Sequence, residues 1–212
     1  MRRFKPPPVP GILWLAVILM TGWLTFEATQ IAYSQGYVRG ETEAEAATRV
    51  EWRSRREVQI EASADLMQAR NSKLYRAKAV HYSRLIYEEC EKQGVGHLQL
   101  VAQMIVESGL NEYATGAAGE IGLMQILPWW LDKWAELGLE PISETELYDP
   151  ANNIKWGVAI LARCLRNTNG NLHKALCFYN AGPKWQNGIK YADKVLRLRS
   201  QLEEHAAQMQ AG

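Results

Sequence analysis

The stretch that most restricts the fold of this chain is an apolar helical segment that ends in a single glutamate. Leu98, Val101 and Ile105 recur at the three- and four-residue spacing of one helix face. Glu107 stands in the last turn, and Ser108-Gly109 then ends the helix, because a glycine there adopts the left-handed conformation at little cost. The sequence therefore predicts a buried helix with a carboxyl group at its C-terminal end.

This position predicts that the Glu107 carboxyl stays protonated near neutral pH. Apolar neighbours disfavour the charged form of a carboxylate. The C-terminal end of a helix is negative, and it raises the pKa of a nearby acid as well. An acid of this kind can donate a proton to a leaving-group oxygen. We therefore take Glu107 as a candidate general acid, in preference to a solvent-facing charge at a helix end.

The composition fits one folded domain with attached segments. The chain has 212 residues, 47% of them hydrophobic, and its net charge of +1 gives no reason to expect a nucleic-acid partner. Cys90, Cys164 and Cys177 form no CxxC pair and have no histidine at ligand spacing, so we expect neither a metal nor a cofactor. Either Cys164 pairs with Cys177 outside the cytoplasm, or all three are small buried side chains.

The beginning of the chain predicts a membrane anchor. Residues 1–10 hold three basic side chains and a proline-rich run, and we expect them to form a cytoplasmic tail. Residues 11–26 carry no charge, and a helical pattern continues to Tyr33, which gives the about 20 residues that a spanning helix needs. We therefore expect an uncleaved single-span anchor at residues 11–33. A cleaved signal peptide is the alternative, although no good cleavage site follows.

A long helix without proline or glycine is predicted over residues 41–93. Ile60, Met67 and Leu74 recur every seven residues, but the other seam positions are small or polar. We expect residues 34–78 to form a solvated helical stalk, which would hold the remainder away from the membrane. Self-association of this stalk as a dimeric coiled coil is the alternative.

A mainly α-helical domain is predicted over residues 79–205, followed by a C-terminal tail at residues 206–212. An apolar stripe at helical spacing, residues 82–90, forms its first helix. Asp149-Pro150 starts a later helix, because aspartate caps the first turn and proline fits within it. No long stretch alternates apolar and polar residues in the way that a β-strand does. Further helices are expected at residues 130–139, 172–178 and 191–205.

Four pieces of the sequence occur in the order of one known family. They are Glu107-Ser108-Gly109, residues 119–125 (GEIGLMQ), residues 149–154 (DPANNI) with Gly157, and Ala175-Leu176 followed by residues 179–182 (YNAG). Together they resemble the catalytic domain of soluble-type lytic transglycosylases, which is related to goose-type lysozyme. The resemblance covers about residues 79–199 and implies a lysozyme-like α fold.

The resemblance also implies a substrate and a reaction. The substrate would be peptidoglycan, cut between N-acetylmuramic acid and N-acetylglucosamine. Glu107 would first protonate the glycosidic oxygen and then act as a base on the muramoyl 6-hydroxyl, which closes onto C1 and leaves a 1,6-anhydro end. Because no water is consumed, the second carboxylate that glycosidases use is not required.

Other site residues follow from the same resemblance. Tyr179 would place its hydroxyl near the Glu107 carboxyl as a second catalytic residue. Core packing is the alternative for Tyr179 and Met124, and a purely local role at a helix stop or a turn is the alternative for Ser108 and Asn180. The substrate-binding residues that the resemblance implies are Ser108, Glu120, Met124, Gln125 and Asn180.

Two residues depart from the family pattern. Gly116 stands where many members have serine, and Glu120 stands where alanine or serine is more usual. Goose-type lysozymes place a second acid in this region of the loop. Glu120 is therefore either a carboxylate that positions water and diverts turnover to hydrolysis, or a residue that caps the loop.

The sequence thus predicts a peptidoglycan lytic transglycosylase held at the bacterial inner membrane, with its catalytic domain on the periplasmic side. Local cutting of this kind suits a secretion or conjugation apparatus, or a phage that crosses the wall. Two other classes stay open. One is a wall-binding protein that keeps the fold without the chemistry, and the other is a coiled-coil assembly factor.

Overall fold

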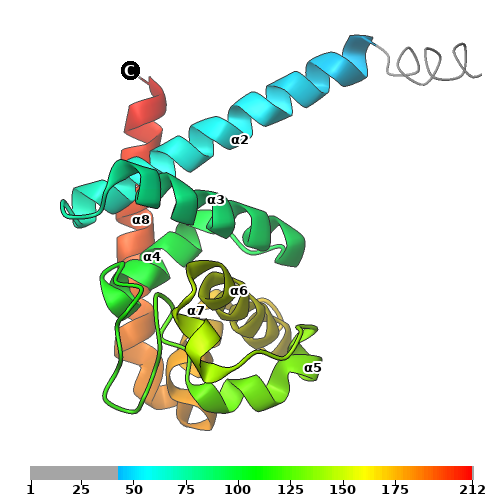
Figure 1. The fold of residues 1–212 in the computed structure, drawn as a ribbon. Coiled ribbons are helices and arrows are strands. Elements are labelled where there is room, and N and C mark those ends of the chain that lie inside the picture. The colour runs from blue at the N-terminus through cyan, green and yellow to red at the C-terminus, as the bar shows by residue number, and fades with distance from the viewer. Residues whose placement is uncertain (1–42, 212) are drawn as a thin grey trace, which may run out of the picture. The chain divides into compact units, whose positions relative to one another are not determined.

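The computed structural model describes residues 43–211, and this part of the chain is built from helices (Figure 1). The predicted cytoplasmic tail and anchor, residues 1–10 and 11–33, lie outside the described residues. The chain divides into two compact units, with the boundary between Arg55 and Arg56. The features described below belong to the second unit, Arg56–Gly212. No helix within residues 43–211 combines the length and the apolar character that crossing a membrane requires.

The elements follow one another without a strand in the described part of the chain. In chain order they are α2 (Glu43–Arg70), α3 (Arg76–Gln93), α4 (His97–Ser108), the 3-10 turn η1 (Pro128–Lys133), α5 (Trp134–Leu137), the 3-10 turn η2 (Glu144–Tyr148), α6 (Pro150–Asn167), α7 (Leu172–Ala181), the 3-10 segment η3 (Gly182–Gly188) and α8 (Ile189–Ala211).

Local capping explains why several helices begin and end where the sequence predicts. α4 ends at Gly109, which has a φ of 59° in the left-handed region that glycine adopts freely. α6 begins after Asp149, whose side chain accepts a hydrogen bond from the backbone N–H of Asn152. α7 begins after Asn171 in the same way. These predictions are confirmed.

Three local predictions need correction. The helix predicted at residues 130–139 starts earlier as the 3-10 turn η1, because Pro128 supplies the first turn, and its α-helical part, α5, is short. The stretch before Asp149, for which the sequence predicts no helix, contains η2, where the Ser143 cap and Glu146 bond each other reciprocally. α7 continues three residues past its predicted end and stops at Gly182.

The helix predicted over residues 41–93 is in fact a helical hairpin. A turn at residues 71–75 separates α2 from α3, and the Asn71 side chain accepts a hydrogen bond from the backbone of Lys73 within it. α3 then runs back along the end of α2, and ion pairs join the two helices (Figure 1). They link Arg56 to Glu88 at 2.6 Å and Glu57 to Arg84 at 3.0 Å.

The prediction of a solvated stalk is wrong where the structure describes its seam. Ile60, Met67 and Leu74 are 1%, 0% and 6% exposed, and the unit that contains them runs from Arg56 to Gly212. Side chains buried inside one chain do not form a free seam for a second chain. Residues 56–78 therefore belong to the folded unit.

α6 and α4 organise the core around the later site. α6 packs against α3, α7 and η2, and its Ile154, Trp156 and Leu161 are almost fully buried. Burial of each such side chain contributes roughly 1.5–3 kcal/mol. α4 packs against α3 and α8. This packing brings the C-terminal end of α4, with Glu107, beside a helix that begins more than eighty residues later.

The three cysteines are buried free thiols. The structure therefore agrees with the alternative that all three cysteines are small buried side chains, and not with a disulfide bond between Cys164 and Cys177. Burial raises the pKa of the Cys90 thiol to about 12 and that of the Cys164 thiol to about 11. Thiols with such pKa values are poor nucleophiles near neutral pH.

A buried carboxylate fixes the loop that follows α4. Glu112 is 8% exposed and accepts hydrogen bonds from the Tyr82 hydroxyl at 2.5 Å and from the Lys78 ammonium at 2.6 Å. Burial alone raises the pKa of Glu112, but the hydrogen bonds from Lys78 and Tyr82 outweigh it and the net pKa is lowered. Glu112 thus joins this loop to α3 as an ionised group.

Replacing Glu112 with glutamine is expected to lower the free energy of unfolding by about 2 kcal/mol near neutral pH, because Tyr82 and Lys78 lose a charged acceptor. The folded pKa of Glu112 lies below its unfolded value, so the wild type loses this contribution as the pH falls through the folded pKa. Urea unfolding near pH 7, and again at the lowest pH where the chain stays folded, measures both effects. An equal difference between variant and wild type at both pH values would contradict this account.

Candidate active site

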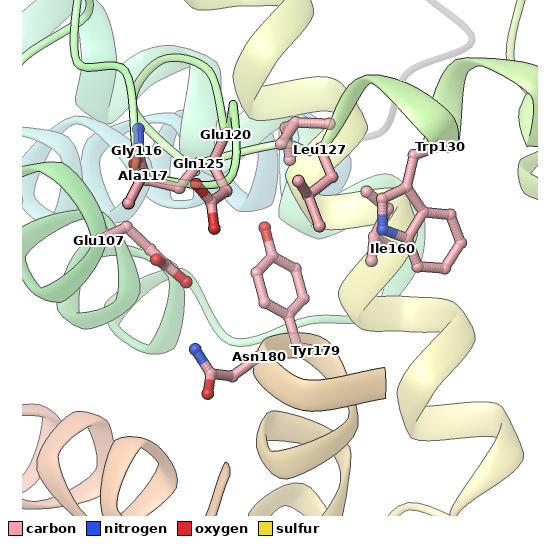
Figure 2. A pocket seen from close by; sticks show the side chains of 11 residues that line it. Glu107, Gly116, Ala117, Glu120, Gln125, Leu127, Trp130, Ile160, Tyr179 and Asn180 are labelled. Atoms are coloured by element: carbon pink, nitrogen blue, oxygen red, sulfur yellow. The ribbon is translucent and has the colours of Figure 1, made fainter. Parts of the chain in front are cut away.

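A pocket of about 170 Å³ lies at the C-terminal end of α4. Figure 2 shows Glu107 and Tyr179 reaching this pocket from different helices, with the loop of Gly116 to Leu127 on another side. Of the residues predicted for the site, Glu107, Glu120, Gln125, Tyr179 and Asn180 line the pocket. The structure thus brings together side chains that are widely separated in the sequence.

Glu107 has the electrostatic character that its position in the sequence predicts. The pKa of its carboxyl is raised to about 7, chiefly by burial and also by the nearby Glu120 carboxylate. A hydrogen bond from Tyr191 and the charge of Lys194 act in the opposite direction. At neutral pH the group is therefore divided between its protonated and charged forms, so it can both give and take a proton.

The hydrogen-bond partner of Glu107 is a residue that the sequence reasoning missed. The Tyr191 hydroxyl donates to Oε1 of Glu107 at 2.5 Å from α8. The Tyr179 hydroxyl donates instead to the backbone carbonyl of Met124 at 3.0 Å, although Tyr179 lines the same pocket. No local signal marks Tyr191, because its proximity to Glu107 depends on the packing of α4 against α8.

The loop of residues 114–126 is closed by its own backbone and side chains. The Gln125 amide donates to the carbonyls of Ala114 and Gly122, and Gln125 itself has a φ of 49°. The Ser108 hydroxyl donates to the carbonyl of Leu123 at 2.9 Å, which ties the end of α4 to this loop. Gln125 and Ser108 therefore hold the shape of the pocket wall.

Met124 lies in the core rather than in the pocket. Its side chain is 0% exposed and packs on α6 at Gly157, where an added Cβ would lie 2.6 Å from the Met124 Cγ. Gly157 has to be a glycine here because of this close approach. For Met124 the structure agrees with the core alternative.

Asn153 anchors the same loop to α6. It is 1% exposed, accepts a hydrogen bond from the backbone of Met124 at 2.7 Å, and donates to the carbonyls of Ile121 and Leu147. All three bonds satisfy backbone groups that would otherwise be buried without a partner. The sequence marked residues 149–154 as a motif, but it did not single out Asn153.

Gly116 and Glu120 are coupled in space. A Cβ added at Gly116 would lie 2.1 Å from Oε2 of Glu120 and 2.8 Å from Oε1 of Gln125. The same Glu120 oxygen accepts a hydrogen bond from the backbone of Ala118 at 2.9 Å. The carboxylate therefore caps the loop, and it does so in space that a side chain at residue 116 would fill. The glycine at residue 116 therefore leaves the space that the carboxylate of Glu120 occupies.

A wider pocket of about 660 Å³ adjoins the first and is mostly apolar. The two pockets share wall residues, among them Trp130 and Tyr179. Trp130 stacks on Trp129, which is 51% exposed, and the Arg163 guanidinium lies over the Trp130 ring at 5.5 Å. We call these two adjoining pockets the groove; the smaller one lies beside Glu107 and the wider one lies over aromatic faces.

The pocket holds one largely buried acid, Glu107, and a second carboxyl group, Glu120, in its wall. Among residues 43–211, no three His, Cys, Asp or Glu side chains are placed to hold a metal ion. One largely buried carboxyl with a pKa near 7 faces the groove, with a tyrosine hydroxyl that stabilises its charged form. This arrangement suits proton transfer to and from a bound substrate.

Comparison with known proteins identifies a family for most of this unit. Residues 84–195 match the family described as the transglycosylase SLT domain. Membrane-bound lytic murein transglycosylase C of Haemophilus influenzae is 38% identical over 87 residues, which are 40% of this chain and 24% of that protein. The protein of that name from Salmonella arizonae is 30% identical over 142 residues, 62% of this chain and 37% of that protein. The chain thus spans well under half the length of these curated relatives.

Among solved structures, an inactive mutant of the lytic transglycosylase Slt from Pseudomonas aeruginosa has a TM-score of 0.50 with this chain. The two are 20% identical, and the match covers 68% of this chain and 28% of that one. At this level of identity the likeness concerns the fold. The predicted lysozyme-like α fold of the catalytic domain agrees with it.

Replacing Tyr191 with phenylalanine is expected to raise the pKa of Glu107 by about half a unit to one unit, because the buried carboxylate loses its hydrogen-bond donor. The carboxyl carbon of Glu107, followed by NMR as the pH is varied, measures this shift. Tyr179→Phe is the matched control, because its hydroxyl bonds the backbone of Met124 and should leave the pKa of Glu107 near its wild-type value. Equal shifts in both variants would show that the hydrogen bond is not the cause.

Proposed function

The chain belongs to the transglycosylase SLT domain family, and we propose that it is a peptidoglycan lytic transglycosylase. It would cleave the β-1,4 bond between N-acetylmuramic acid and N-acetylglucosamine. The observation that carries the proposal is Glu107, a carboxyl with a pKa of about 7 that lines the smaller pocket of the groove. The names of its relatives, which are lytic murein transglycosylases, support the same substrate class.

In the first step, protonated Glu107 donates its proton to the oxygen that links the two sugars. The bond between this oxygen and C1 of the muramoyl sugar breaks, and the N-acetylglucosamine leaves as an alcohol. Positive charge develops at C1, and Glu107 is left as a carboxylate. The Tyr191 hydroxyl donates to this carboxylate at 2.5 Å and stabilises it.

In the second step, the Glu107 carboxylate accepts the proton of the muramoyl 6-hydroxyl. The O6 oxygen then bonds to C1 and closes a 1,6-anhydro ring, while Glu107 returns to its protonated form. One carboxyl acts as an acid and then as a base, for which a pKa near the working pH is most effective. Atoms balance without water, because the substrate supplies its own nucleophile.

The glycan strand would lie along the groove that the two pockets form. Trp129 and Trp130 offer flat apolar surfaces at its wide end, and the apolar faces of sugar rings pack well on such surfaces. Asn180 is exposed beside Glu107 and can bond sugar hydroxyl or acetamido groups. We assign substrate binding to Trp129, Trp130 and Asn180. Gln125 and Ser108 would support the wall of the groove.

We also propose that residues 11–33 anchor the enzyme in the bacterial inner membrane, with the catalytic unit on the periplasmic side. The uncharged run and its basic flank support this placement. The curated relatives are named membrane-bound, which agrees with it. An anchored enzyme would cut the wall locally, as a secretion or conjugation apparatus or a phage requires when it crosses the wall.

A second candidate activity is hydrolysis of the same bond, with Glu120 as the second carboxylate. The observation that favours it is the empty space at Gly116, which lets the Glu120 carboxylate lie in the pocket wall close enough to affect the pKa of Glu107. A carboxylate across the groove from the acid can activate a water molecule for attack at C1. The product would then carry an ordinary reducing end.

Glu107→Gln is expected to reduce the release of anhydro-muropeptides from purified peptidoglycan by about a thousandfold, because the amide can neither donate nor accept the proton. The full chain and the variant are compared by mass spectrometry of the soluble products. The Glu140→Gln variant, whose carboxyl is exposed and lies outside the pocket, is the control for a general loss of a carboxylate. Binding to peptidoglycan with no Glu107-dependent product would indicate a wall-binding or assembly protein instead.

Glu120→Gln separates the two activities. If Glu120 activates water, the variant is expected to lower the fraction of reducing ends while anhydro ends persist. Gly116→Ser tests the same point independently, because its side chain would displace the Glu120 carboxylate from the pocket wall. An unchanged ratio of the two product types in both variants would leave Glu120 as a loop cap, through its bond to the backbone of Ala118.

A further inference from the structure

Two glutamine side chains are buried on the face of α4 that leads to the catalytic acid. Gln99 is 2% exposed and Gln103 is 0% exposed, and they precede Glu107 by eight and four residues. Residues four apart lie above one another on one face of a helix. A buried amide costs stability unless its groups are hydrogen-bonded, so a fully buried glutamine requires specific partners. The partners of Gln103 lead directly to Glu107.

A chain of hydrogen bonds connects these side chains to the acid. The Gln99 amide donates to Oε1 of Gln103 at 3.5 Å, which leaves the Gln103 amino group facing α8. That amino group donates to the Tyr191 hydroxyl oxygen at 3.3 Å. The Tyr191 hydroxyl in turn donates to Oε1 of Glu107 at 2.5 Å. The bonds thus run in one direction, from the core toward the pocket.

The bond from Gln103 limits what the Tyr191 hydroxyl can do. A phenolic O–H prefers the plane of its ring, so its proton points to one side or the other. The Gln103 amino group donates to the hydroxyl oxygen and occupies an acceptor position on it, which leaves the hydroxyl proton for the acceptor Glu107. Without that donor, the hydroxyl is free to turn over and accept a hydrogen bond from protonated Glu107.

We propose that Gln103 is a positioning residue for the acid, because its amide holds the Tyr191 hydroxyl as a donor to Glu107. This inference rests on the proposed function, since it concerns the group that would transfer the proton. A fixed donor stabilises the carboxylate that is present between the two steps. A hydroxyl that turns over would stabilise the protonated form as well and so delay the first proton transfer.

The charged and titratable groups that face Glu107 come from several elements. Tyr191 and Lys194 lie on α8, Glu120 lies in the loop that follows α4, and Tyr179 lies on α7. Lys194 favours the charged form of Glu107 and Glu120 favours the protonated form. Substitution at Gln103 leaves all of these groups in place. A change in the titration of Glu107 would therefore report on the direction of the Tyr191 hydroxyl.

The test is a double-mutant cycle in the full chain with Gln103→Met and Tyr191→Phe. Methionine fills a similar volume and carries no amide donor, and Gln103→Leu serves as a second variant if the methionine variant does not fold. In each variant the carboxyl carbon of Glu107 is titrated by NMR and the pH profile of kcat/KM is recorded. Thermal unfolding reports any loss of stability separately.

We expect Gln103→Met to raise the pKa of Glu107 by about half a unit and to move the basic limb of the pH profile upward by the same amount. In the Tyr191→Phe background, the substitution should add no further shift, because there is no hydroxyl left to direct. An unchanged titration in a folded Gln103 variant would overturn the proposal. A shift that adds fully to that of Tyr191→Phe would overturn it as well.

Failure of the proposed function would look different from failure of this inference. If the wild type releases no Glu107-dependent muropeptides, the proposed activity fails, and the NMR titration still reports whether Gln103 acts on Glu107 through Tyr191. If the wild type is active and the titration is unaffected by Gln103→Met, the activity stands and the role of Gln103 is refuted.

Discussion

Burial of one carboxyl group at the end of α4 is the constraint on which the rest of the site depends. Without a hydrogen-bond donor, a carboxyl buried there would have a higher pKa, so less of it would be in the charged form that accepts a proton near neutral pH. The hydrogen bond from Tyr191 on α8 offsets part of this effect, and the pKa of Glu107 settles near 7. The packing of α4 against α8 therefore affects the acid–base behaviour of Glu107, because it places the Tyr191 hydroxyl where it can donate to the carboxyl.

Much of this arrangement is local and follows from the sequence. Gly109 and Asp149 set the boundaries of their helices through interactions within one turn, which sequence patterns indicate directly. The upward shift in the pKa of Glu107, which burial causes, has the direction that the apolar segment before it predicts. The order of the four motifs predicts the family, and the match of residues 84–195 confirms it.

The features that the sequence did not predict depend on contacts between distant segments. Tyr191 meets Glu107 only through the packing of two helices, and Gly116 makes room for Glu120 only through the fold of one loop. The hairpin of α2 and α3 turns at Asn71, in a stretch with no glycine or proline. The apolar residues that recur every seven positions are buried within the same chain. Periodicity shows that these residues are buried on one side, but it does not show what covers them.

We propose that the bond is cleaved by the substrate's own 6-hydroxyl, with one carboxyl as acid and then base. Digestion of purified peptidoglycan in water enriched in oxygen-18 distinguishes attack by the 6-hydroxyl from attack by water. We expect 1,6-anhydro ends that are lighter by one water than reducing ends and contain no heavy oxygen. Products that carry oxygen-18 at the new muramoyl terminus would show attack by water and would contradict this proposal.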